Sequence, residues 1–434
     1  MKGLIALSKK EAHRVEVMEQ VVLGRIGLKM ASQLLDLSYR QSRRIKTRYS
    51  ALGIAGLCHG NRGKQSANAM DPAVRSRILS LHEDRYSGLN DSHFTELLAQ
   101  REGIGVSRES VRRILRSAGK GPKRKRRPPK HRSRRPRKPT PGIMAQWDGS
   151  PHRWFGPNHP PVCLMAAVDD ADGKLLGALF IAAESSEGYL RLLAMMLRRH
   201  GVCLSIYHDR HSSLVRNDDH WSREEQLQGY QYPTHVGRVL EELGVASIPA
   251  NSPQAKGRIE RKFGVLQDRM IEDMRLEGIV GVQAANRWIE ETYIARHNAK
   301  FGKEPSGEGS AFRKISARQI HHIVCFAYEA TVGNDNCVRL GGLLIDIPKG
   351  KGGVSYAKKR VLVRQHLDGT WSVWLGDEKI GSHNATEFKE PVRSWKSRNG
   401  EAAGKRGETM QVYVSSKPAP RTKGHFPVAV KGTD

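Results

Sequence analysis

The chain has 434 residues, which at roughly 150 residues per domain suggests about three domains. Its 73 lysines and arginines exceed its 44 aspartates and glutamates by 29, and this excess predicts a polyanionic partner. A hydrophobic fraction of 38% excludes wholesale disorder. The longest apolar run, Leu175–Ala183, is too short for a membrane span, so we expect a cytoplasmic protein with no membrane partner. The five cysteines are scattered and support neither a disulfide framework nor a zinc knuckle.

The first 119 residues predict two helix-turn-helix units, at 1–65 and 66–119. In the first unit, an apolar helix around Met30–Leu35 precedes a three-residue turn and a second helix capped by Ser38. In the second unit, a basic helix capped by Ser107 takes the same place. Helices of this kind can enter a major groove, and we expect DNA contacts from Arg40, Arg43, Arg44, Lys46, Arg108, Arg112, Arg113 and Arg116. The alternative is a pair of small helical bundles with solvated arginine faces.

A basic linker is predicted at 120–140. From Lys120 to Lys138, 12 of 19 residues are Lys or Arg, four are Pro and none is acidic. Such a segment cannot pack into a core, so we expect it to extend along a phosphate backbone. The expected contacts include Lys123, Arg124, Lys125, Arg126 and Arg127.

Residues 141–305 predict an α/β domain whose elements follow the order βββαβαβα. The expected strands are Ile143–Asp148, Pro161–Val168, Leu175–Ala183, Val202–Tyr207 and Val245–Pro249, and the expected helices are Glu187–His200, His235–Leu243 and Ala255 to about Arg275. This order is that of the RNase H-like fold, in which the first and fourth strands are neighbours at the centre of the sheet.

The order of strands and helices suggests a chemical role for three acidic residues. Asp148 ends the first strand, Asp209 follows the fourth strand 61 residues later, and Glu260 lies on the last helix, 51 residues further on. Three converging carboxylates would repel each other unless cations neutralise them, and oxygen ligands favour Mg²⁺ or Mn²⁺. Two such ions could support an in-line displacement at phosphorus. Each acid on its own could also be a turn, cap or surface residue, as we expect for the aspartates at 169, 170 and 172.

The motifs around these acids resemble those of ISNCY-type insertion-sequence transposases, in the DDE transposase and retroviral integrase superfamily. The resemblance is carried by Gln146–His152, Asp209–His211 and Asn251–Arg261, and it covers nearly the whole chain. It implies Asp148, Asp209 and Glu260 as catalytic, metal-binding residues with two Mg²⁺ or Mn²⁺ ions. Around the acidic residue of the last helix, we expect DNA contacts from Lys256, Arg258 and Arg261.

The C-terminal region predicts a small SH3-like β-barrel at 320–390 and a flexible tail at 391–434. The expected strand segments are Phe326–Val332, Val338–Ile347 and Arg360–Leu375, and Asp368-Gly369 is typical of a hairpin turn. The barrel could hold DNA on its basic surface or be merely structural.

The expected fold class is therefore multidomain: an α-helical tandem helix-turn-helix region, an α/β RNase H-like catalytic core and a small C-terminal β-barrel. The expected function is a bacterial, nucleoid-associated enzyme that binds insertion-sequence ends and catalyses metal-dependent DNA cleavage and strand transfer. Its expected partners are double-stranded DNA, both transposon ends and target, and further copies of itself in a homodimer or higher multimer. Two rivals stay open: a DNA-binding regulator with an inactive core, and a nuclease without transfer activity.

Overall fold

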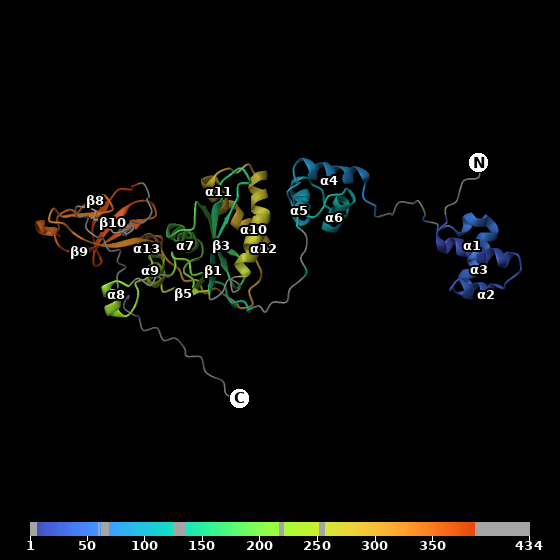
Figure 1. Ribbon diagram of the computed structural model, residues 1–434, viewed down its shortest axis with the longest axis horizontal. Helices are drawn as coiled ribbons and strands as arrows, with labels where there is room; N and C mark the ends of the chain where they lie inside the picture. The colour runs from blue at the N-terminus through green and yellow to red at the C-terminus, as the bar shows by residue number, and fades with distance from the viewer. Residues whose placement is uncertain are drawn as a thin grey trace, which may run out of the picture. The chain divides into compact units, whose positions relative to one another are not determined.

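The computed structural model of the chain describes residues 7–59, 61, 69–124, 128, 135–216, 221–250 and 257–386. The chain divides into two compact units, residues 1–80 and 81–434 (Figure 1). In the described part of the chain, no helix has both the length and the apolar character needed to cross a membrane.

The first unit is a small helical cluster. It contains α1 (Lys9–Val22), α2 (Leu28–Leu34), α3 (Tyr39–Leu52) and the short 3-10 helix η1 (Gly53–Leu57). Ser38 caps α3, as its sequence predicts, because its hydroxyl accepts the N–H of Gln41 at 3.3 Å. Asp36 turns the chain between α2 and α3 in the left-handed region, with φ of 51°. Met18, Ala31 and Ile45 are buried between the helices.

Three further helices follow: α4 (Pro72–Asp84), α5 (Asp91–Arg101) and α6 (Arg108–Ser117). Asn90 and Ser107 cap α5 and α6 through their side-chain oxygens, and the Ser107 cap was predicted from sequence. Phe94, Leu98 and Val111 are fully buried. The caps at Ser38 and Ser107 start α3 and α6 where the sequence predicts, while the assignment of these helices to helix-turn-helix units stays a prediction.

A five-stranded mixed sheet forms the centre of the second unit. Its strands are β1 (Ala145–His152), β2 (Val162–Asp169), β3 (Leu175–Ile181), β4 (Ser205–His208) and β5 (Ala246–Pro249), in the spatial order β3-β2-β1-β4-β5. β1, β2 and β3 pair antiparallel, and β1, β4 and β5 pair parallel. The predicted adjacency of the first and fourth strands is confirmed, and the strand order fits an RNase H-like core.

Helices cover the sheet on both sides (Figure 1). One side carries α7 (Ser186–His200) and α9 (His235–Glu242), with α8 (Arg223–Gln228) in the segment before α9. The other side carries α10 (Gly257–Leu276), α11 (Val282–Trp288) and α12 (Ile294–Phe301), with the π-helical turn η3 (Ile289–Tyr293) between the last two. Strands such as β2 and β3 are buried along almost their whole length, which explains their continuous apolar sequences.

The C-terminal part begins with α13 (Ala317–Ile323) and continues in two antiparallel sheets. The larger sheet has the order β11-β10-β9-β6, and the smaller is the hairpin β7-β8. Their bounds are β6 (Cys325–Thr331), β7 (Cys337–Leu340), β8 (Leu343–Asp346), β9 (Arg360–His366), β10 (Trp371–Leu375) and β11 (Glu378–His383), with the 3-10 turn η4 (Lys351–Gly353) between β8 and β9.

The expected hairpin at Asp368-Gly369 is present between β9 and β10. The expected strand Val338–Ile347 is wrong as one strand, because Gly341 and Gly342 turn the chain with φ of 54° and 86°. Closure into an SH3-like barrel stays a prediction, and the predicted tail at 391–434 lies outside the described residues.

Candidate active site

The register of the central strands bears on two of the three predicted catalytic carboxylates. β1 and β4 run parallel, with Ala145 opposite Ile206 and Gln146 opposite Tyr207. Asp148 and Asp209 lie two residues beyond the last of these pairs and have the same offset of 61 residues. Adjacent strands lie about 4.8 Å apart, so a continued offset would make these two residues neighbours.

The β1 residue Asp148 lies on the sheet face that α10 covers. Side chains alternate along a strand, so residues 146, 148 and 150 share one face. Gln267 of α10 donates to the Ser150 hydroxyl at 3.2 Å. Arg258 of α10 and Gln146 of β1 both donate to the carboxylate of Asp170. Asp148 therefore lies between two connections from β1 to α10, the helix that carries Glu260.

The Glu260 side chain is exposed at the first turn of α10. Carboxylate oxygens are the donors that Mg²⁺ prefers, so the chemistry of the predicted triad suits that ion. Among the described residues, however, no group of three or more His, Cys, Asp or Glu side chains is arranged to hold a metal ion. The structure thus brings the helix of Glu260 to β1 without gathering the three acids into a metal centre.

A buried tyrosine lies beside the two aspartates. Tyr189 of α7 stacks on Trp147 at 5.8 Å between ring centroids, and both rings are fully buried. Burial raises the pKa of Tyr189 far above its ordinary value, and Glu184, Asp209 and Asp148 add to the effect through their negative charge. The hydroxyl is therefore protonated and donates a hydrogen bond to Glu184.

Sequence analysis did not single out Glu184, which follows β3 just before the Ser185 cap of α7. Its carboxylate lies against the backbone next to Asp148: a Cβ on Gly149 would come within 2.6 Å of Glu184 Oε2. A side chain at 149 would therefore displace the Glu184 carboxylate. No local signal could have identified Glu184, because its partners come from β1 and α7.

A second carboxylate, Asp170, connects the segments around the candidate site. It is 1% exposed and accepts hydrogen bonds from Gln146 Nε2 (2.7 Å), Arg135 Nη2 (2.7 Å), the Lys138 backbone N–H (2.8 Å) and Arg258 Nη1. Burial alone would raise its pKa, but the bonds from Arg258, Lys138 and Arg135 hold the pKa below the ordinary value. Asp170 is therefore an ionised buried carboxylate: it lies in the turn after β2, as the sequence predicts, and its side chain also binds the linker, β1 and α10.

Comparison with known proteins decides the family. The chain is 36% identical over 334 residues to a Sinorhizobium fredii protein that carries the name transposase y4bF, with 76% of this chain and 71% of that protein covered. It is 31% identical over 328 residues to the transposase for insertion sequence IS1202 of Streptococcus pneumoniae, with 68% and 69% covered. The chain belongs to the insertion-sequence transposases. The predicted resemblance is confirmed at this level, and no protein-family model matches the chain.

Solved structures resemble this transposase only weakly. The HTLV-2 integrase catalytic core domain with magnesium has a TM-score of 0.24 at 13% identity, covering 35% of this chain and 86% of that one. The simian T-cell lymphotropic virus intasome with a PP2A regulatory subunit has a TM-score of 0.28 at 14% identity, covering 72% of this chain and 100% of that one. Scores this low carry no argument, so the fold assignment rests on strand order.

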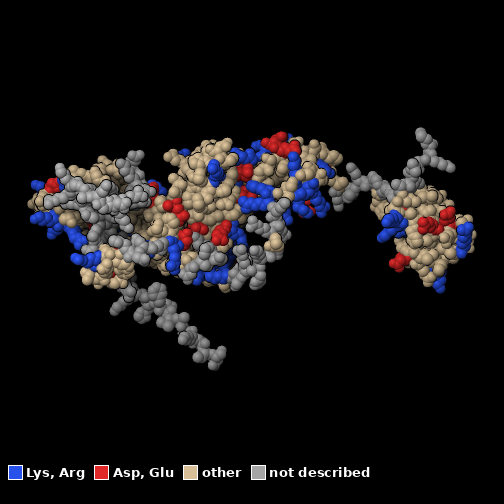
Figure 2. All heavy atoms as spheres, viewed as in Figure 1, with Lys and Arg blue, Asp and Glu red and all other residues tan. Residues whose placement is uncertain are grey.

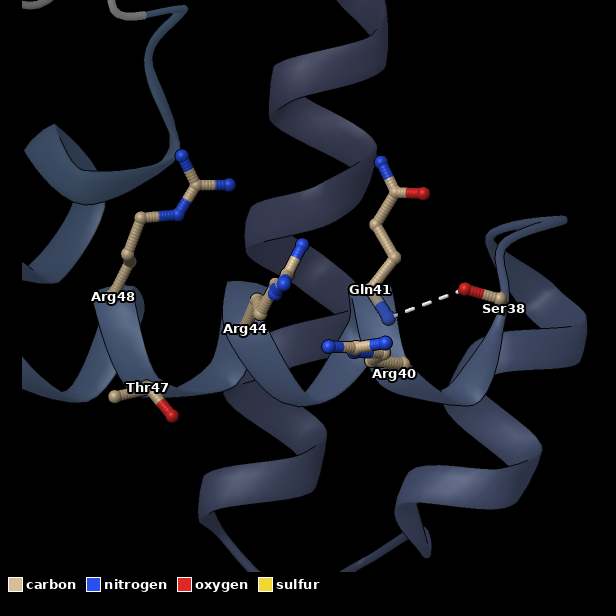
Figure 3. A pocket seen from close by; sticks show the side chains of 6 residues that line it. All are labelled: Ser38, Arg40, Gln41, Arg44, Thr47 and Arg48. Carbon is tan, nitrogen blue, oxygen red and sulfur yellow. Dashed lines mark hydrogen bonds between the residues drawn. The ribbon is translucent and has the colours of Figure 1, made fainter.

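Two of the four predicted DNA-binding residues of α3 line an open pocket (Figure 3). Arg40 and Arg44 line it, together with Ser38, Gln41, Thr47 and Arg48. Arg43 is exposed outside this set, and Lys46 is half-buried. Arg48 was missed, although it continues the i, i+4 row of Arg40 and Arg44 and could have been read from that spacing.

On α6 of the transposase, the predicted residues differ in what they contact. Arg108 is exposed. Arg112 and Arg113 are exposed and pair with Glu109 on their own helix. Arg116 is half-buried and donates to Asp91 at 2.6 Å. Three of the four therefore face solvent, while the fourth stabilises the contact between α5 and α6.

The linker and α10 residues are placed only in part. Lys123 pairs with Asp268 of α10 at 3.2 Å, and Arg124 and Arg261 are exposed. Arg258 pairs with Asp170, as described above. Lys125, Arg126, Arg127 and Lys256 lie outside the described residues. On the face shown in Figure 2, acidic side chains gather near the five-stranded sheet, with Lys and Arg around them.

Proposed function

We propose that this transposase is a DDE-type polynucleotidyl transferase that cleaves DNA at the ends of its insertion sequence and joins those ends to target DNA. Asp148, Asp209 and Glu260 are its catalytic triad. The observation that supports the proposal is the register of β1 and β4, whose offset of 61 residues equals the spacing of Asp148 and Asp209, together with the position of Glu260 on the neighbouring helix α10.

The three carboxylates would hold two divalent cations, Mg²⁺ or Mn²⁺. When bound, such ions supply Lewis acidity to the attacking hydroxyl and to the leaving 3′ oxygen. The protein contributes orientation: Asp148 and Asp209 are held by the central strands, and Glu260 approaches from the first turn of α10. The buried Trp147 and Tyr189 close the apolar side of the site.

DNA ends are recognised by α3 and α6 in this proposal, and the basic linker follows phosphates between them and the catalytic core. Exposed arginines on both helices support it. Two DNA ends must meet for insertion, so the active form is a dimer or higher multimer, working at the bacterial nucleoid.

The triad is tested with Asp148→Asn, Asp209→Asn and Glu260→Gln, assayed for end cleavage and strand transfer with Mg²⁺ and with Mn²⁺. Each substitution removes one ligand charge, so we expect cleavage and joining to fall more than 100-fold while end binding persists. Glu291→Gln, which changes an exposed glutamate on η3, is the matched control and should stay active. Normal turnover by any one triad variant removes that residue from the triad.

The same assay separates the rival functions. Joining of the cut end to a second duplex distinguishes a transposase from a nuclease. Binding without any cleavage by the unmodified protein in either metal favours the regulator.

A further inference from the structure

The Asp170 carboxylate joins three segments: the end of the linker, β1 and, more than 100 residues further on, α10. Gln146 belongs to β1, Arg135 and Lys138 to the linker, and Arg258 to α10. Arg258 also donates to the backbone carbonyl of Arg135, so α10 and the linker are bound to each other as well as to Asp170.

Two of these partners stand next to proposed catalytic residues. Gln146 precedes Asp148 by two residues and lies on the same face of β1. Arg258 precedes Glu260 by two residues, in the same turn of α10. One buried carboxylate thus connects the strand of the first acid to the helical turn of the third.

This network is buried, so few other donors could take the place of the ones it has. The Asp170 side chain is 0% exposed and that of Arg258 is 22% exposed. A buried carboxylate is tolerated only where donors satisfy it, so loss of one donor leaves a charge that water cannot reach easily. The first turn of α10 is therefore held to the sheet by a contact that has few substitutes.

We propose that Asp170 is a positioning residue, which holds the first turn of α10 against β1 so that Glu260 can reach Asp148 and Asp209. This inference rests on the proposed function for its catalytic consequence, while its structural part does not. Asp170 does not touch the reacting atoms in this scheme; it acts through Arg258.

Hydrogen–deuterium exchange of the full-length protein tests the structural part. Amides of residues 261–264 bond to the carbonyls of the first turn of α10 and report its opening. In Asp170→Asn we expect these amides to exchange at least 10-fold faster, with little change at residues 266–274 of the same helix. Asp169→Asn is the matched control, because Asp169 is equally buried but, among the described residues, accepts hydrogen bonds from the backbone N–H groups of Gly142, Ala171 and Asp172 and not from Arg258.

Strand transfer measured on the same proteins tests the catalytic part. We expect Asp170→Asn to lower its rate at least 10-fold with end binding unchanged, and Asp169→Asn to stay close to the unmodified rate. Arg258→Gln should reproduce both effects of Asp170→Asn, and Arg258→Lys should recover part of the rate because it keeps one charged donor.

The outcomes are distinct. Unchanged exchange at 261–264 in both Asp170→Asn and Arg258→Gln overturns the inference, as does faster exchange without any loss of strand transfer. If amides along the whole chain exchange faster in Asp170→Asn, the exchange of residues 261–264 in Arg258→Gln alone decides the inference. An unmodified protein that transfers no strands refutes the proposed function, while the exchange result still answers whether Asp170 holds α10.

Discussion

Arg269 of α10 donates two hydrogen bonds to the carboxylate of Glu96 on α5, at 2.7 and 3.0 Å. Lys300 of α12 pairs with the same carboxylate, and buried His93 meets Asp273 at 3.0 Å beside it. The helix α5, which the Arg116–Asp91 pair joins to α6, is therefore attached to the helix that carries Glu260.

This attachment predicts a pH-dependent contribution to stability. Burial would raise the pKa of Glu96, but Arg269 and Lys300 lower it below the ordinary 4.5. Its contribution is complete above pH 4.5 and is lost as pH falls through the lowered pKa. In urea unfolding, we expect Glu96→Ala to cost about 2 kcal/mol at pH 7 and progressively less as pH falls below 4.5. Glu83→Ala, which breaks the exposed pair with Lys120, should cost less than Glu96→Ala at pH 7, and an equal cost would contradict the assignment.

Lys262 of α10 predicts a second rise of stability with pH, in the alkaline range. Burial, with the nearby Arg137 charge, lowers its pKa from 10.5 to about 8, and its Nζ lies 3.3 Å from Nε2 of His297. Between pH 8 and 10.5 the unfolded chain keeps the proton that the folded chain has lost, so stability rises with pH in this window. Relative to Lys262→Met, the unmodified protein should gain on the order of 2 kcal/mol from pH 8 to pH 10. A constant difference between the two proteins would refute the lowered pKa.

The pocket on α3 predicts which arginines matter for end binding. Arg40, Arg44 and Arg48 share its lining, so Arg48→Ala should weaken binding to the insertion-sequence end as much as Arg44→Ala, by about 1 to 3 kcal/mol. Arg25→Ala changes an exposed arginine before α2 and serves as the control. Fluorescence anisotropy measures the binding of each variant to cognate and random duplexes. Equal losses of affinity in Arg48→Ala, Arg44→Ala and Arg25→Ala would indicate a general charge effect.

Contacts at the two ends of the linker reduce the number of its cationic side chains that we expect to bind phosphates. Of its 12 cationic side chains, Lys120, Lys123, Arg135 and Arg137 have partners within the protein. If about half of the other eight contact phosphates, replacing those eight with Gln should reduce the slope of log affinity against log salt by about 3.5. Cognate and random duplexes should lose affinity equally, since phosphate contacts do not specify sequence. An unchanged slope would make the linker a passive tether.

The sequence was sufficient for features that depend on local pattern. Alternation and apolar spacing predicted the five core strands and the long helix α10 to within a few residues. The caps at Ser38 and Ser107 were also predicted. The adjacency of β1 and β4 followed from the order of elements. The strand β11 was missed, because Glu378–His383 is polar and is buried only at its centre.

Contacts between distant residues could not be predicted in this way. Asp169 and Asp170 are adjacent aspartates at the end of one strand, and sequence assigned both to the turn. Only the first binds turn amides, while the second reaches Arg258, 88 residues away. Arg258 and Arg116 were likewise assigned to DNA because a basic side chain does not show from sequence whether a carboxylate of the same chain lies opposite it.

The Asp170–Arg258 pair also limits how this gene can drift. Removing one partner of a buried ion pair typically costs about 3 to 5 kcal/mol. Replacing both Asp170 and Arg258 with apolar residues would leave Gln146, Arg135 and the Lys138 N–H without their acceptor, so a double replacement does not restore the network. Copies of the element that decay after insertion, free of selection, should therefore lose this pair, while copies that still move should keep it.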